Sequence, residues 1–110
     1  MIVIRIDKPK QHIIFEGHAD FAKEGHDVVC ASVSATMMTL RSVLLKCNID
    51  HSFGVTAKPY VEIKIRSNTK YARGIFKGVC ELLEAIMRDY PKNVTIAEKE
   101  LITGIDTNAQ

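Results

Sequence analysis

The feature that most constrains the fold is the spacing of apolar residues, which changes along the chain. Apolar residues recur at every second position in short segments and at every third or fourth position in two long ones. Residues 1–6 alternate, with Ile2, Ile4 and Ile6 on one face, as is typical of a half-buried β-strand. The same alternation predicts further strands over residues 12–17, 53–57, 60–66 and 94–98. Apolar stripes over residues 28–47 and about 70–90 predict two amphipathic helices.

These elements give the order β-β-α-β-β-α-β, which predicts an α+β two-layer sandwich. Apolar and charged side chains alternate in residues 60–66, so one face of the sheet is expected to be dry and the other, with Glu62 and Lys64, solvated. That pattern is typical of an antiparallel sheet covered on one side, and we expect a mostly antiparallel sheet. At 110 residues the chain has the length of one domain, predicted over 1–110 with a frayed tail at 103–110.

Composition narrows the class of protein. Fifteen basic and 13 acidic residues give a net charge of +2, which is too mild to indicate nucleic-acid binding by charge alone. No apolar run approaches the roughly 18 residues of a membrane span, and the start of the chain lacks a secretory signal pattern. Three scattered cysteines with no C-x-x-C pair argue against disulfides and zinc. We therefore expect a cytoplasmic protein with free thiols and no metal or cofactor.

Cys30 is the residue whose position best suits chemistry. It is expected in the first turn of the first helix, where unpaired N–H groups and the helix dipole favour an anion and so lower a thiol pKa. A cysteine nucleophile also needs an imidazole, and the loop that begins at His18 returns to this helix. Asp27 is a plausible helix N-cap, and its carboxylate is also placed to orient an imidazole.

A purely structural role for Cys30 is the main alternative. Cysteine is among the most buried residue types, and Cys30 shares a stripe with core positions. Cys47 and Cys80 have no nearby histidine and are expected in the core. A metal site formed by His18, His26 and Cys30 fits no usual ligand spacing.

One stretch resembles a known family. Residues 17–19 read Gly-His-Ala, Gly25 follows in a short loop, and residues 27–34 read Asp-Val-Val-Cys-Ala-Ser-Val-Ser. This resembles the bacterial ribosomal-processing cysteine proteases, usually called Prp, in the His-to-Cys interval, the Asp three positions before Cys and the Ser four after it. The departures are Val28 for the usual Ile and Ser32 for the usual Ala. The resemblance covers the whole chain in element order and length, and it is specific in residues 17–34.

The resemblance implies a cytoplasmic, typically homodimeric peptidase. Such enzymes remove a short N-terminal extension from the large-subunit ribosomal protein numbered twenty-seven, cutting after an apolar stretch that ends in Phe. By the resemblance, Cys30 would be the nucleophile and His18 the general base and acid. The supporting residues that it implies are Asp27, Ser34, Gly17 and Gly25, the two glycines giving the loop freedom to cover the substrate.

The expected partners are the precursor peptide and a second copy of the chain, with no membrane and no direct nucleic-acid ligand. One alternative is a non-catalytic ribosome- or RNA-associated module in which Cys30 is buried. Another is a plain dimerising scaffold. Thiol reactivity separates the peptidase from both, and salt-dependent RNA binding separates the two alternatives from each other.

Overall fold

The structure, a computed structural model, describes residues 1–17, 26–55 and 60–101, without the side chains of His26 and Asp27. The elements in chain order are β1 (Ile2–Asp7), β2 (His12–Glu16), α1 (His26–Lys46), β3 (His51–Val55), β4 (Tyr60–Ile65), α2 (Lys70–Asp89) and β5 (Val94–Glu98). The predicted order β-β-α-β-β-α-β is confirmed. The expected frayed tail at 103–110 lies outside the described residues.

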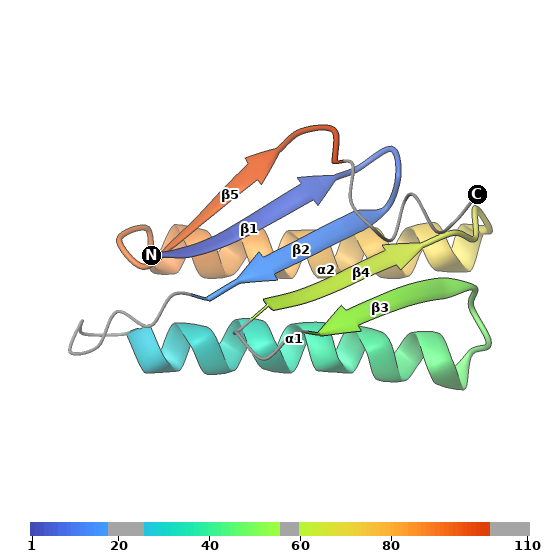
Figure 1. The fold of residues 1–110 in the computed structure, drawn as a ribbon, viewed down its shortest axis with the longest axis horizontal. Coiled ribbons are helices and arrows are strands. Elements are labelled where there is room, and N and C mark those ends of the chain that lie inside the picture. Colours follow the sequence, from blue (N-terminus) through green and yellow to red (C-terminus); the bar gives the residue numbers. More distant parts are fainter. Residues whose placement is uncertain (18–25, 56–59, 102–110) are drawn as a thin grey trace.

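The five strands form one sheet in the order β3-β4-β2-β1-β5 (Figure 1). Strands β1 and β2, β2 and β4, and β3 and β4 pair antiparallel, whereas β1 and β5 pair parallel. The parallel pair arises because α2 carries the chain back along the sheet before β5 begins. The prediction of a mostly antiparallel sheet is therefore confirmed.

Both helices pack against the same face of the sheet, and one core lies between the layers. From β1 the core contains Ile2, Ile4 and Ile6, and from β2 and β4 it contains Ile13, Phe15, Ile63 and Ile65. The helices contribute Val29, Val33, Met37, Leu40, Leu44, Ala72, Phe76, Cys80 and Leu83. Because each fully buried aliphatic side chain contributes about 2 kcal/mol, this core holds α1 firmly on the sheet.

Strand β3 begins at His51, two residues earlier than the alternation of residues 53–57 predicts. The guanidinium of Arg66 donates to Asp50 Oδ1 at 2.7 Å and to the carbonyl oxygen of His51 at 3.0 Å. These contacts hold the start of β3 against the end of β4. They involve polar groups, so the alternation of apolar residues does not predict them.

The sheet face away from the helices is less solvated than expected. Glu62 is only 6% exposed, which corrects the prediction that it faces solvent. Its Oε2 lies 2.6 Å from His12 Nε2, and its Oε1 accepts from the Tyr60 hydroxyl at 3.1 Å. A carboxylate with two such partners is buried without the cost of an unpaired charge.

Helix α1 is more apolar than we expected from the sequence. Residues Val28–Lys46 are long and apolar enough to cross a membrane by length and composition, which corrects the expectation that no segment approaches a span. One face of this helix, including Val33 and Met37, is fully buried against the sheet. The core helix of a globular domain meets the same criterion, so composition by itself does not indicate a span.

Candidate active site

The structure describes only part of the predicted site. Cys30 and Ser34 lie on α1, and Gly17 directly follows β2. His18 and Gly25 lie outside the described residues, and Asp27 is described by its backbone alone. The pairing of His18 with Cys30 therefore stays a prediction, whereas the structure describes the surroundings of Cys30 on α1.

Cys30 is half-buried and packs against the hydrophobic core. The neighbouring Val29 and Val33 are completely buried, so the helix backbone at Cys30 is anchored on the sheet. A thiol placed this way has a fixed backbone position and part of its surface outside the core. That combination suits a nucleophile better than the fully buried cysteine of the structural alternative.

Helix α1 begins at His26, two residues earlier than predicted. Asp27 is therefore the second helical residue, which corrects its prediction as the N-cap. The N–H groups that lack intrahelical partners belong to the residues before position 30, so the positive end of the helix lies within about one turn of Cys30. An acidic residue in this first turn is favoured by the helix dipole in its own right.

The hydroxyl groups near Cys30 divide into two kinds. Ser32 Oγ donates to the carbonyl oxygen of Val28 at 2.8 Å, and Thr36 Oγ1 donates to that of Ser32 at 2.8 Å. These two hydroxyls are engaged with the helix backbone. Ser34 is half-buried one turn after Cys30, on the same side of the helix, where a supporting residue is expected.

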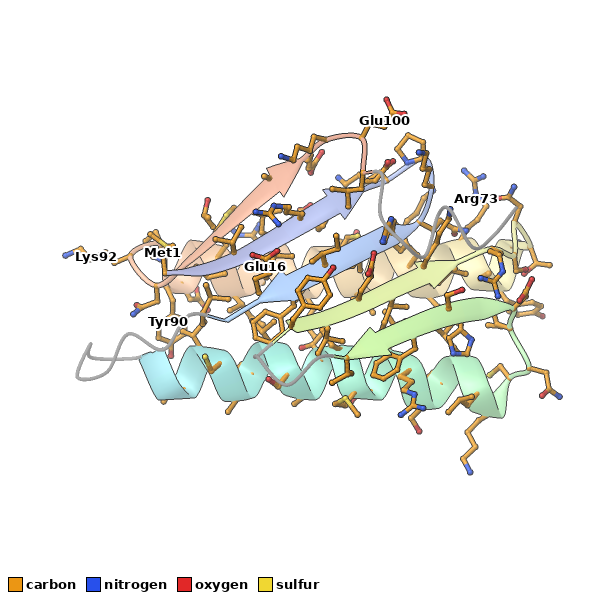
Figure 2. The ribbon with its side chains drawn as sticks, viewed as in Figure 1. Met1, Glu16, Arg73, Tyr90, Lys92 and Glu100 are labelled. Carbon is orange, nitrogen blue, oxygen red and sulfur yellow. The ribbon has the colours of Figure 1, made fainter. Side chains whose placement is uncertain are left out.

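A polar cluster missed by the sequence reading lies on the helix-free face of the sheet, at the strand ends that adjoin the site. Glu16, the last residue of β2 (Figure 2), pairs in register with Tyr60 and forms an ion pair with Arg5. The Tyr60 hydroxyl donates to Glu62, and burial together with that carboxylate raises the pKa of Tyr60 to about 12. The sequence of a single strand does not indicate this cluster, because the register between β2 and β4 decides which residues meet.

The other two cysteines differ from each other. Cys80 is 4% exposed, and burial raises the pKa of its thiol to about 11, as expected for a core residue. Cys47 is exposed, which corrects its prediction as a core residue. The helix ends at Lys46, so position 47 leaves the apolar stripe whose spacing it continues in the sequence.

Within residues 1–17, 26–55 and 60–101, no group of three or more His, Cys, Asp or Glu side chains could hold a metal ion. A set containing His18 falls outside that search. A cleft of about 690 Å³ lies beside Lys8, Arg73, Phe76 and Cys80, at the β1–β2 turn. Strand β2 separates this turn from the start of α1, so the cleft is remote from Cys30 (Figure 1).

Comparison with known proteins identifies one family. The sequence profile of the family described as cysteine protease Prp matches residues 1–95. The ribosomal processing cysteine protease Prp of Mycoplasma genitalium is 26% identical over 97 residues, covering 88% of this chain and 97% of that protein.

Two solved structures share the fold. One is the ribosomal processing protease Prp from S. aureus with a covalently linked product peptide, at 24% identity and a TM-score of 0.75, covering 90% of this chain and 100% of that one. The other is the same protease with a substrate peptide, at 22% identity and a TM-score of 0.77, covering 89% of this chain and 97% of that one.

Proposed function

Because this chain belongs to the cysteine protease Prp family, we propose that it removes the short N-terminal extension of the large-subunit ribosomal protein numbered twenty-seven. It is a cysteine-type peptidase by family. The proposed cut follows an apolar stretch that ends in Phe. In this proposal Cys30 is the nucleophile, and His18 is the general base and acid.

The chemistry proceeds by acyl transfer. His18 takes the proton of Cys30 Sγ, and the thiolate attacks the carbonyl carbon of the substrate's Phe, which the scissile bond joins to the nitrogen of the next residue. The tetrahedral intermediate collapses to a thioester as His18 returns the proton to the leaving amine. Water, deprotonated by His18, then hydrolyses the thioester and restores the thiol. The N–H groups at the start of α1 favour the negative charge on the intermediate's oxygen.

The observation that carries this proposal is the position of Cys30. It is half-buried within about one turn of the positive end of α1, on a helix whose inner face is fixed in the core. Asp27 in the first helical turn and Ser34 one turn after Cys30 are the proposed supporting residues. Gly17 and Gly25 bound the segment that carries His18 and are proposed to let it cover the substrate.

The direct test is incubation with the precursor ribosomal protein, followed by intact mass measurement. The expected result is one new species shortened by the extension, with cleavage after Phe. The Cys30→Ala and His18→Ala variants should lose nearly all cleavage, and the double variant should be little worse than either, because the two residues act as a unit. Ser32→Ala is the matched control, and it should retain turnover. Near-normal cleavage by His18→Ala would remove His18 from the mechanism.

The substrate's Phe is tested separately. Changing it to Ala in a peptide that spans the cut should lower kcat/KM at least about tenfold, because loss of an aromatic anchor costs more than about 1.4 kcal/mol. Equal cleavage of both peptides would place the specificity elsewhere in the substrate.

We further propose that the protein acts in the cytoplasm as a homodimer and contacts the precursor without binding nucleic acid directly. The mild net charge of +2 supports the absence of direct nucleic-acid binding. Cell fractionation tests the location, and light scattering of the purified protein tests the assembly. Detection in the membrane fraction would contradict the cytoplasmic location, and a mass of 12.3 kDa at every concentration would contradict the homodimer.

A further inference from the structure

The cleft between the β1–β2 turn and α2 has the dimensions of a small-molecule site. Its volume is about 690 Å³, within the range of about 300–1,000 Å³ that is usual for ligand pockets. Gln11 lines it from the turn, and Arg73, Phe76, Lys77 and Cys80 line it from α2, so it is called here the α2 cleft. Arg73 and the start of α1 lie at opposite ends of the molecule (Figure 2), so this cleft is separate from the proposed active site.

Gln11 supplies a buried hydrogen-bond acceptor at the α2 cleft. Its side chain lies in a residue that is only 6% exposed, and its Nε2 donates to the carbonyl oxygens of Ile65 at 3.2 Å and Ser67 at 2.7 Å. These two contacts fix the orientation of the amide, because an oxygen in the place of Nε2 would face two other oxygens. Gln11 Oε1 is buried and has no hydrogen-bond partner among the described residues. Since an unpaired buried acceptor costs free energy, Oε1 favours a ligand that brings an N–H donor.

Arg73 and Lys77 supply positive charge at the same cleft. Both are exposed, they lie about one turn apart on α2, and neither forms an ion pair with another described residue. Lys8 also lines the cleft, but its Nζ is engaged with Glu84 at 3.5 Å and with Glu98 at 3.1 Å. A guanidinium beside an ammonium group suits a phosphate, because the guanidinium can donate two parallel hydrogen bonds to its oxygens.

The acidic residues of the α2 cleft limit how much negative charge it accepts. Three cationic side chains and two carboxylates line it, and the carboxylates are those of Glu81 and Glu84. Glu84 is engaged with Lys8, whereas Glu81 lies about one turn after Lys77 on α2. The carboxylate of Glu81 would repel a second and a third phosphate group. The charges therefore suit a ligand with a single phosphate.

The remaining wall of the α2 cleft is apolar and fixed. Phe76 and Cys80 are each 4% exposed, and both belong to the hydrophobic core. A flat apolar ring fits against such a wall without exposing it to water. The ligand that combines a flat ring, an N–H donor on the edge of that ring and one phosphate is a nucleoside monophosphate.

We propose that the α2 cleft binds a nucleoside monophosphate. The base lies against Phe76 and donates an N–H group to Gln11 Oε1, and the phosphate lies between Arg73 and Lys77. This inference goes beyond the proposed peptidase activity and does not depend on it, because the cleft shares no residue with the proposed catalytic site.

The first experiment compares ligands by isothermal titration calorimetry on the wild-type protein, without peptide substrate. AMP is the probe because its base carries one donor, the amino group, and we expect it to bind saturably. Purine riboside 5′-monophosphate lacks that amino group and should bind at least about tenfold more weakly, because Oε1 then stays unpaired. Adenosine lacks the phosphate and should also bind at least about tenfold more weakly. ATP should bind no more tightly than AMP.

The second experiment uses variants of α2. Arg73→Gln should weaken the binding of AMP at least about tenfold and leave that of adenosine unchanged, because only AMP carries the phosphate. The matched control is Arg88→Gln, at an exposed arginine of the same helix that does not line the cleft. It should bind AMP as the wild type does, and thermal melts confirm that both variants fold.

Five outcomes would overturn the proposal. They are no saturable binding of AMP, equal binding of AMP and purine riboside 5′-monophosphate, competition by inorganic phosphate as strong as by AMP, an equal loss in Arg73→Gln and Arg88→Gln, and tighter binding of ATP than of AMP. The equal binding of the two purine ligands would show that Gln11 Oε1 does not contact the base. Strong competition by inorganic phosphate would reduce the cleft to a simple anion site. A short RNA that binds when AMP does not would assign Arg73 and Lys77 to a nucleic-acid surface instead.

Discussion

At the scale of single residues, the three cysteines form a built-in comparison of thiol environments. Cys30 is half-buried at a helix start, Cys47 is exposed, and Cys80 is buried with its thiol pKa raised to about 11. At neutral pH only about one Cys80 thiol in ten thousand is ionised, and the thiolate is the reactive form. The three environments therefore predict three distinct rates of alkylation.

We expect iodoacetamide near neutral pH to label Cys30 fastest, Cys47 at the rate of an ordinary surface thiol, and Cys80 only after unfolding. Peptide mapping against time measures the three rates. The His18→Ala variant should slow Cys30 and leave Cys47 unchanged. A Cys30 rate no higher than that of Cys47 would contradict activation by the helix start and His18.

Tyr60 predicts a dependence of stability on alkaline pH. Its pKa is raised to about 12 in the fold, against about 10 in an unfolded chain. The folded state therefore holds the proton more tightly, and the resulting stabilisation is fully present below pH 10. It is lost as the pH rises from about 10 to 12.

In urea unfolding over this pH range, the free energy of unfolding of the wild type should fall more steeply than that of Tyr60→Phe. Tyr71→Phe, at a side chain that is 83% exposed, is the control and should follow the wild type. Parallel curves for the wild type and Tyr60→Phe would show that Glu62 and burial do not act on this hydroxyl.

The residues that sequence reasoning placed well are those whose surroundings are local. Cys30 and Ser34 lie on one side of one helix, and spacing alone predicts that. The contact of His12 with Glu62 joins residues 50 positions apart and depends on the register of β2 against β4. No periodic pattern in a single strand contains that register, so the buried polar cluster appears only in three dimensions.

At the scale of elements, α2 begins with a side-chain cap. Ser-Asn-Thr at 67–69 precedes the apolar stripe, and in the structure Thr69 is the N-cap, whose Oγ1 accepts from the N–H of Ala72 at 3.2 Å. We expect Thr69→Ala to lower the free energy of unfolding by about 1 kcal/mol, measured by urea unfolding. Thr69→Ser keeps the acceptor and should cost much less. Equal losses in the two variants would mean that the cap hydrogen bond is not the cause.

Element boundaries were less predictable than element types. All seven elements follow from the spacing of apolar residues. Burial of one face imposes a spacing of two residues on a strand and of three or four residues on a helix. Helix α1 and strand β3 each begin two residues earlier than the pattern indicates. At β3 the cause is the contact of Arg66 with Asp50 and the carbonyl of His51, which lies outside any hydrophobic repeat.

At the scale of the whole molecule, the segment after β5 ties the end of the described chain back to its beginning. The N–H of Leu101 donates to Asp7 Oδ2 at 2.9 Å, and the Leu101 carbonyl oxygen accepts from Lys10 Nζ at 3.2 Å. The N–H of Lys99 donates to the carbonyl oxygen of Ile6 at 3.0 Å. This closure lies beyond the residues that match the family profile, which end at 95.

Leu101 is only 5% exposed, so its side chain should contribute to the stability of the entire sandwich. We expect Leu101→Ala to lower the free energy of unfolding by about 2–3 kcal/mol, as at other buried leucines. Leu82→Ala, at a site that is 50% exposed, is the matched control and should cost about 0.5 kcal/mol or less. Because Leu101 binds at the β1–β2 turn and α1 begins beyond the opposite end of β2 (Figure 1), kcat and KM measured well below the melting temperature should equal those of the wild type. A Leu101→Ala protein as stable as Leu82→Ala would show that the segment is no part of the folded core, and a changed kcat would couple this closure to the distant site.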